Sequence, residues 1–137
     1  MLIMSTLAQI LRTLRAWRWI IDPPHQAAHR EGLRLLKENL SADQRRQFAR
    51  FDYFEVIGGD SGARYRIHPS SRMNIEQLDE KGERVRVLCF GPKGELPLGD
   101  TLLAQKIALE SFERETLQIA NALPPNRVLS PPLGYRF

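Results

Sequence analysis

Apolar residues recur at helical spacing over the first twenty residues. The intervals between them alternate between four and three, which predicts an amphipathic helix from about Leu2 to Ile21. The positions are Ile3, Leu7, Ile10, Leu14, Trp17 and Ile21, with Leu11 and Ile20 beside them. Arg12, Arg15 and Arg18 recur every three residues and form a basic stripe next to the apolar one.

Two further helices are predicted before the pattern changes. The first runs from Pro24 to Leu40, although Gly32 in its middle lowers the helix propensity by about 1 kcal/mol. Ser41 and Gln44 have the spacing of a capping box, in which each side chain bonds the backbone N–H of the other residue. This box predicts a short helix over about Ala42 to Arg50.

From Tyr53 onward the apolar positions alternate every second residue, which predicts β-strands. The first and last pairs of strands are separated by glycine-containing links of hairpin composition, and the middle connection is short. Consecutive strands with short links favour an antiparallel meander. The predicted strands are Tyr53–Ile57, Arg64–His68, Asn74–Leu78 and Arg84–Phe90.

One long helix and a tail complete the predicted elements. Asp100 is placed to cap a helix that continues to about Leu123 and stops before Pro124-Pro125. Residues 126–137 include Pro131-Pro132 and are predicted to be extended.

These elements define an α+β protein. We expect N-terminal helices, a four-stranded antiparallel β-meander, a long C-terminal helix packed on the sheet and an extended Pro-containing tail. The length of 137 residues favours one domain. We therefore divide the chain into a basic amphipathic helix (1–22), a single α+β domain (23–125) and the tail (126–137).

Charge is distributed unevenly along the chain. The net charge is +4, and residues 1–51 hold nine Lys or Arg against four Asp or Glu. A basic half on a near-neutral remainder favours a polyanionic or acidic partner, and it is equally compatible with a solvated helix surface. The single cysteine, Cys89, cannot form an internal disulfide, and no apolar run reaches the ~18 residues of a membrane span. We therefore expect a cytoplasmic protein of bacterial type.

Two short motifs resemble those of the chymotrypsin family. Ala27-Ala28-His29 has the surroundings of that family's histidine, and Gly59-Asp60-Ser61-Gly62 has those of its serine. A chain of this length cannot hold two six-stranded barrels, and His29 falls within a predicted helix. A glycine-rich hairpin turn accounts for Asp60 and Ser61 without any catalytic role.

No other group of residues defines a reaction. His25 and His29 lie one helical turn apart, but zinc needs a third and usually a fourth protein ligand at a recognisable spacing. Cys89 alternates with Val85 and Val87, which predicts a small buried side chain. The sequence thus indicates no metal, no cofactor and no enzyme.

A basic face of the sheet is one candidate binding site. By alternation, Arg64, Arg66 and His68 should share a side of the sheet with Arg84 and Arg86, and Arg72 should lie nearby. Such a patch suits phosphates or carboxylates. Four acids could instead neutralise it through cross-strand pairs, and we favour that interpretation. These acids are Glu55, Glu76, Glu80 and Glu83.

The N-terminal helix is the leading candidate. It can pack on its own domain, dock in a groove of another protein or lie on an anionic membrane. We favour a small, non-catalytic assembly subunit, with a protein partner or a homo-oligomer, and keep nucleic-acid binding by the basic sheet face as the alternative. The residues expected to contact the partner are Arg12, Leu14, Arg15, Trp17, Arg18, Ile20 and Ile21.

Overall fold

The computed structural model of the chain describes residues 6–13, 24–70 and 72–131. Residues 6–13 are helical. The remaining helices are α2 (Pro24–Asn39), α3 (Ala42–Phe51), α4 (Leu98–Ser111) and α5 (Glu113–Ile119). The strands are β1 (Phe54–Ile57), β2 (Arg64–Ile67), β3 (Ile75–Leu78), β4 (Arg84–Cys89) and β5 (Asn121–Leu123). The predicted α+β class is confirmed.

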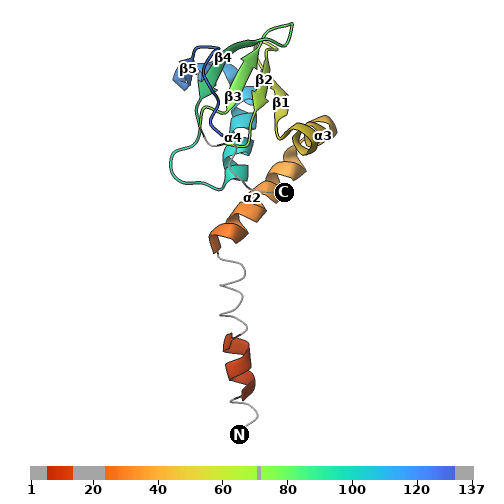
Figure 1. Cartoon of the computed structure of the whole chain (residues 1–137), viewed down its shortest axis with the longest axis vertical. Helices are drawn as coiled ribbons and strands as arrows, with labels where there is room; N and C mark the ends of the chain where they lie inside the picture. Colours follow the sequence, from red (N-terminus) through yellow and green to blue (C-terminus); the bar gives the residue numbers. More distant parts are fainter. Residues whose placement is uncertain (1–5, 14–23, 71, 132–137) are drawn as a thin grey trace.

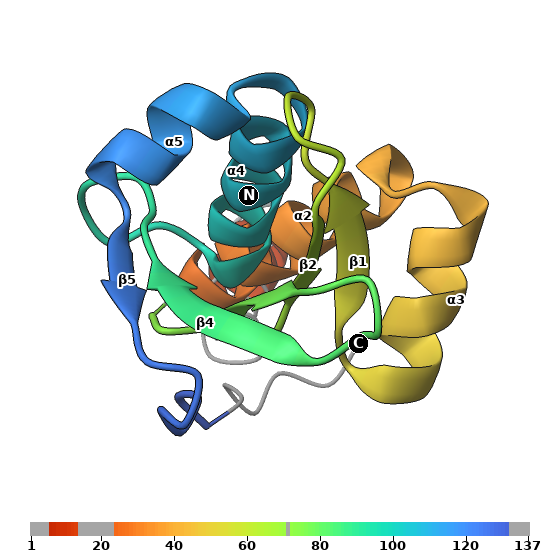
Figure 2. The same ribbon diagram turned by 90° about the horizontal axis from the view of Figure 1, so that it is seen from above.

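The strands form one antiparallel sheet in the order β1-β2-β3-β4-β5. All four predicted strands are present within one residue of their predicted bounds, and β5 adds a fifth. Helix α4 covers one face of the sheet, α2 packs against α4, and α3 lies beside β1 (Figures 1 and 2). We call the face that points away from α4 the outer face.

The hydrophobic core lies between α4 and the sheet. Every second residue of β1 and β2 points into it. Cross-strand partners such as Phe54 and Ile67 share a face of the sheet, so the inward residues of the two strands lie side by side. Helix α4 contributes residues one helical turn apart, and α2 and α3 close the side. The core residues are Leu36, Leu40, Phe48, Phe54, Val56, Tyr65, Ile67, Ile75, Leu88, Leu98, Leu102 and Leu109.

Helix α3 begins at the predicted capping box and closes the edge of the sheet. The Ser41 hydroxyl accepts from the Gln44 N–H at 3.1 Å, and the Gln44 side chain accepts from the Ser41 N–H at 3.0 Å. The same Gln44 side chain donates to the carbonyl of Glu55, and Gln47 accepts from the N–H of Glu55. Two glutamines of α3 therefore satisfy backbone groups on the open side of β1.

Glycine in the middle of α2 has a packing role that its helix propensity does not reveal. A Cβ atom on Gly99 of α4 would lie 2.2 Å from the Gly32 carbonyl group. The two helices thus approach backbone to backbone at Gly32 and Gly99, and only glycine fits at the second position. Gly32 marks a helix crossing rather than a weak point of α2.

The predicted helix from Asp100 to Leu123 is wrong at its start. Helix α4 begins at Leu98, and its N-cap is Pro97, which has no side-chain hydrogen bond to offer. The Leu98 N–H instead donates to Nδ1 of His29 on α2 at 3.4 Å. The cap is supplied by another helix, so the local sequence around Asp100 gives no sign of it.

The predicted helix is also wrong at its end. It breaks at Phe112, whose φ of −138° and ψ of 40° are not helical. Helix α5 then ends at Ile119, and residues 121–123 pair with β4 instead of continuing as a helix. Strand pairing at the edge of the sheet outweighs the local helical pattern, and Ile119 is exposed rather than buried.

Strand β4 contains a bulge that changes which residues share a face. Gln77 of β3 pairs with Arg86, and the next residue, Leu78, pairs with Arg84, so that Val85 is an extra residue on β4. An extra residue reverses the alternation beyond it. Val87 therefore lies on the outer face, where it is fully buried, and Val85 is exposed. The predicted common face of Val85 and Val87 is wrong.

The chain after β5 begins with a turn and then runs without regular secondary structure. The Arg127 N–H donates to the carbonyl of Pro124 at 3.0 Å, which closes the turn. Residues 127–131 follow without regular secondary structure. We refer to residues 124–131 as the tail segment; residues 132–137 lie outside the described part of the chain.

Candidate functional site

The helix of residues 6–13 has every residue exposed (Figure 1). Three of its apolar side chains, Leu7, Ile10 and Leu11, are 59%, 52% and 53% exposed. Arg12 is also exposed, next to this apolar stripe. The other predicted contact residues lie outside the described part of the chain; they are Leu14, Arg15, Trp17, Arg18, Ile20 and Ile21.

Two arginines of the predicted basic face share one carboxylate on the outer face. Arg64 and Arg66 of β2 both bond Glu55 of β1, each at 3.0 Å. Glu55 is the cross-strand partner of Arg66, so the pairing follows from the register of the two strands. The prediction that acids of neighbouring strands neutralise this face is confirmed for Glu55.

His68 and Arg84 are paired in the same way by Glu76. The His68 ring bonds one carboxylate oxygen of Glu76, and Arg84 Nε bonds the other at 2.9 Å. The hydrogen bond from His68, followed by that from Arg84, outweighs burial and lowers the pKa of Glu76 to about 2. Glu76 is therefore ionised at neutral pH and holds Arg84 in place. Glu80 and Glu83 lie exposed in the turn between β3 and β4.

The other two residues of the predicted basic face do not belong to it. Arg86 pairs with Gln77, on the helix-facing side of the sheet, and donates to its side chain at 2.6 Å. The bulge at Val85 separates it from Arg84. Arg72 lies in the loop between β2 and β3 and lines a pocket of about 460 Å³ with His29 and the loop before α4. The six predicted residues are thus split among three places.

An aromatic cluster missed by the sequence analysis borders the outer face. The rings of Phe51 and Tyr53 are stacked with their centroids 5.3 Å apart. The Arg50 guanidinium lies 5.1 Å from the Phe51 ring, and the Arg66 guanidinium lies 4.9 Å from the Tyr53 ring. His68 also contacts Tyr53. Phe51 closes a helix and Tyr53 precedes a strand, so neither periodicity places the two rings together.

The glycine-rich turn between β1 and β2 encloses a buried carboxylate. Glu113, the first residue of α5, is 1% exposed. One of its oxygens accepts from the N–H groups of Asp60 and Ser61 at 2.9 and 2.7 Å, and the other accepts from the hydroxyls of Ser61 and Tyr65 at 2.5 and 2.7 Å. A Cβ atom on Gly58 would lie 2.2 Å from this carboxylate. The turn needs glycine because Glu113 fills the space beside it.

Ser61 of the protease-like motif lies in the turn between β1 and β2, as the hairpin interpretation predicts, and its hydroxyl donates to the Glu113 carboxylate at 2.5 Å. His29 lies on α2, where its Nδ1 accepts from the Leu98 N–H. Glu113 anchors the turn to α5, and Arg114 extends the contact through its N–H to Asp60 at 2.9 Å.

The acids near the end of α4 are also occupied within the domain. Glu113 is buried, and Glu110 bonds Lys106 at 2.5 Å and Gln44 at 3.2 Å. Of the three acids that the sequence places here, Glu115 is exposed. Glu110 and Glu113 thus have their hydrogen-bond partners within the domain.

A buried pair of amides joins the sheet to α4. Asn74 and Gln105 exchange two hydrogen bonds of 2.8 and 3.1 Å. Asn74 also donates to the carbonyl of His68, and Gln105 donates to that of Phe90. Both residues are almost fully buried, and their polar atoms are matched to one another, so their role is structural.

The described residues provide no metal site and no membrane span. Within residues 6–13, 24–70 and 72–131, no three His, Cys, Asp or Glu side chains come together in a way that could hold a metal ion. No helix of this part of the chain is long and apolar enough to cross a membrane.

Comparison with known proteins yields no significant match among protein-family models, curated proteins or solved structures. No activity or partner can therefore be carried over from a relative, and the function has to be inferred from the residues themselves.

Proposed function

We propose that this chain is a small, non-catalytic binding or assembly protein that docks on a partner protein through its amphipathic N-terminal helix. The observation that carries this proposal is the exposure of Leu7, Ile10 and Leu11, which are all more than half accessible to solvent. Three large apolar side chains on consecutive helical turns are normally covered by another surface. A groove in a partner is the kind of surface that fits an amphipathic helix.

The charge next to the apolar stripe indicates the chemistry of that groove. Arg12 is exposed beside Leu11, and Arg15 and Arg18 continue the same three-residue spacing in the sequence. A matching partner would have an apolar floor and an acidic rim. Trp17 in the sequence would supply the anchor, because Trp and Arg contribute a large share of the binding energy at protein interfaces.

The alternative, nucleic-acid binding by the basic sheet face, has less support from the geometry. Phosphate binding needs cations whose charge is not already balanced. Arg64 and Arg66 share Glu55, and Arg84 bonds Glu76. The aromatic rings beside this face are already stacked on one another or on arginines. Few groups are left to hold phosphates or to stack on bases.

Affinity capture from native lysate distinguishes the two functions. The full chain is compared with Leu11→Asp and Trp17→Ala, and with Gln9→Ala as a matched control on the same helix. Each capture is performed with and without nuclease at 50 and 200 mM salt. We expect the same protein partners with the wild type and Gln9→Ala at both salt concentrations, and their loss with Leu11→Asp and Trp17→Ala.

Three outcomes would contradict the proposal. Nucleic acid recovered equally with all four proteins, and lost between about 50 and 200 mM salt, would favour phosphate binding by the body. A clear drop in the thermal midpoint of Leu11→Asp would show that the helix packs on its own domain in solution. Sedimentation of the wild type with anionic vesicles, without any protein partner, would assign the helix to a membrane surface instead.

A further inference from the structure

The tail segment is held against the outer face of the sheet almost entirely through its backbone. Arg84 Nη1 donates to the carbonyls of Pro125 at 3.2 Å and of Arg127 at 2.9 Å. The Ser130 N–H donates to the carbonyl of Met73 at 3.4 Å. Figure 2 shows the segment passing along the side of the sheet opposite α4. Every residue has a backbone carbonyl and every residue except proline has an N–H group, so these contacts do not depend on the side chains of the tail.

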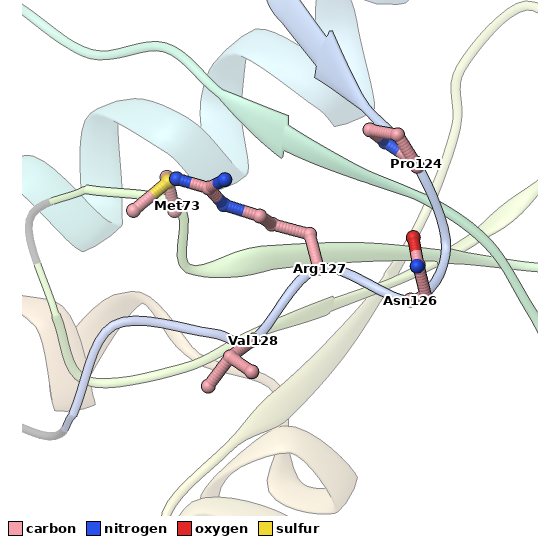
Figure 3. Close-up of a pocket in the computed structure, with 5 residues that line it drawn as sticks. All are labelled: Met73, Pro124, Asn126, Arg127 and Val128. Atoms are coloured by element: carbon pink, nitrogen blue, oxygen red, sulfur yellow. The ribbon is translucent and has the colours of Figure 1, made fainter.

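The side chains of the tail segment contribute little to its attachment. None of residues 124–131 is buried, and Val128 is 81% exposed. A pocket of about 450 Å³ remains between the tail segment and the loop that carries Met73 (Figure 3). The pocket is lined by Met73, Pro124, Asn126, Arg127 and Val128. The tail thus lies on the sheet without filling the space beneath it.

The receiving face, by contrast, is held by contacts within the sheet. Arg84 is held by Glu76, and Glu76 is bonded in turn by His68, so the guanidinium is oriented toward the tail by contacts within the sheet. Beside it, Val87 is fully buried although it lies on the outer face. An oriented donor next to an apolar floor is a suitable surface for an extended peptide, because ordering the donor costs nothing further when the peptide binds.

We propose that the outer face of the sheet is a binding site for an extended, proline-containing peptide, and that residues 124–131 of this chain occupy it as an internal ligand. Arg84 recognises two carbonyls of the bound segment. The prolines limit the conformations that the segment has in solution and therefore reduce the entropy lost on binding. A segment of the same kind on a partner protein would displace the tail.

The proposal is tested with the full chain and a fluorescent peptide that has the sequence of residues 124–137. Binding is measured by anisotropy. The wild type should bind weakly, because its own tail competes at a millimolar effective concentration. Pro125→Gly in the protein loosens the attached tail and should raise the affinity for the peptide by about two- to fivefold. A peptide with its prolines replaced by glycine should bind less tightly than the native one.

Arg84 is tested against a neighbour on the same strand. Arg84→Ala should lower the peptide affinity of the Pro125→Gly protein by about tenfold or more, since two charge-assisted hydrogen bonds are lost. Arg84→Lys keeps a charge beside Glu76 but not the planar guanidinium, and it should lose most of the affinity while remaining folded. Arg86→Ala is the matched control, because its side chain bonds Gln77 on the other face. It should bind the peptide as before.

Trypsin provides a second readout that needs no added peptide. Cleavage after Arg127 requires the tail to leave the sheet, so Arg84→Ala should be cut there about tenfold faster than the wild type. Cleavage of Arg86→Ala should be unchanged. The proposal is overturned if Arg84→Ala and Arg86→Ala are cut at the same rate, or if the Pro125→Gly protein does not bind the peptide at millimolar concentration. It is also overturned if the proline-free peptide binds equally well.

Discussion

Replacing Glu113 by alanine should cost the domain a substantial part of its stability. The carboxylate receives four hydrogen bonds of 2.5–2.9 Å from Asp60, Ser61 and Tyr65. Alanine leaves two backbone N–H groups and two hydroxyls without an acceptor, and each buried donor without a partner costs about 1–3 kcal/mol. The Tyr65 hydroxyl is inside the core, but Asp60 and Ser61 are exposed and can bond water. Taking about 1 kcal/mol, the lower end of this range, for the Tyr65 hydroxyl and somewhat less for each of the three donors of Asp60 and Ser61, we expect a total loss of about 3 kcal/mol.

Urea unfolding followed by far-UV circular dichroism measures this loss. Glu115→Ala is the matched control, because Glu115 lies two residues further along α5 and is exposed. The control should stay within about 0.5 kcal/mol of the wild type. Glu113→Gln should be intermediate, since its amide oxygen can still accept from the two N–H groups of the turn. If Glu113→Ala were no less stable than Glu115→Ala, the anchoring role of the buried carboxylate would be refuted.

Replacing Glu113 by glutamine should also change how the stability of the domain depends on pH. Burial raises the pKa of Glu113, but the hydrogen bonds from Ser61, Tyr65 and the backbone of the turn outweigh it, so the pKa is below its ordinary value. A pKa lower in the folded than in the unfolded state gives stability that is complete above the unfolded pKa of about 4.5 and is lost as the pH falls toward the folded pKa. The difference in stability between the wild type and Glu113→Gln should therefore shrink below about pH 4.5.

Three further perturbations test other contacts. Gly99→Ala places a Cβ atom 2.2 Å from the backbone of α2 and should destabilise the domain by several kcal/mol, as measured by urea unfolding. Gly91→Ala is the control and should not destabilise it, because the nearest neighbours of its Cβ atom would be 3.9 Å away. Asn74→Ala and Gln105→Ala should each lower the free energy of unfolding by about 1–3 kcal/mol, because each leaves its partner amide unsatisfied. A double-mutant cycle in urea should show that the double variant loses less stability than the two single variants added together. The wild type should lose stability as the pH falls from about 4.5 to 2, because the pKa of Glu76 is lowered to about 2 in the folded state. In Glu76→Gln this acid-induced loss should be smaller, which acid titration at fixed urea measures.

Local patterns were sufficient for the elements that are stabilised by nearby residues. The capping box of Ser41 and Gln44 specified the start of α3, and period-two alternation placed β1 to β4 within one residue of their bounds. In each case the partners lie within a few residues or in the next strand of a meander. The pairing of Glu55 with Arg64 and Arg66 followed from the same register.

The errors occur where a distant partner decides the structure. Helix α4 is capped by His29, which is far away in the sequence, and the break at Phe112 brings Glu113 to the turn between β1 and β2. The bulge at Val85 depends on how β3 and β4 fit together, and it moves Arg86 away from the face of Arg84. Buried polar contacts such as that of Glu113 leave no periodic signal, because polar residues are counted as exposed when apolar positions are used to assign faces.

The two edges of the sheet are not equally open to other chains. At β1, the side chains of Gln44 and Gln47 already occupy the outward backbone groups of Glu55, so an incoming strand would have to displace them. At the other edge, β5 is three residues long and can offer only a short ladder. The domain is thereby protected against growing into larger sheets with its own copies. The binding that we propose therefore uses side chains and fixed hydrogen-bond donors rather than strand addition at these edges.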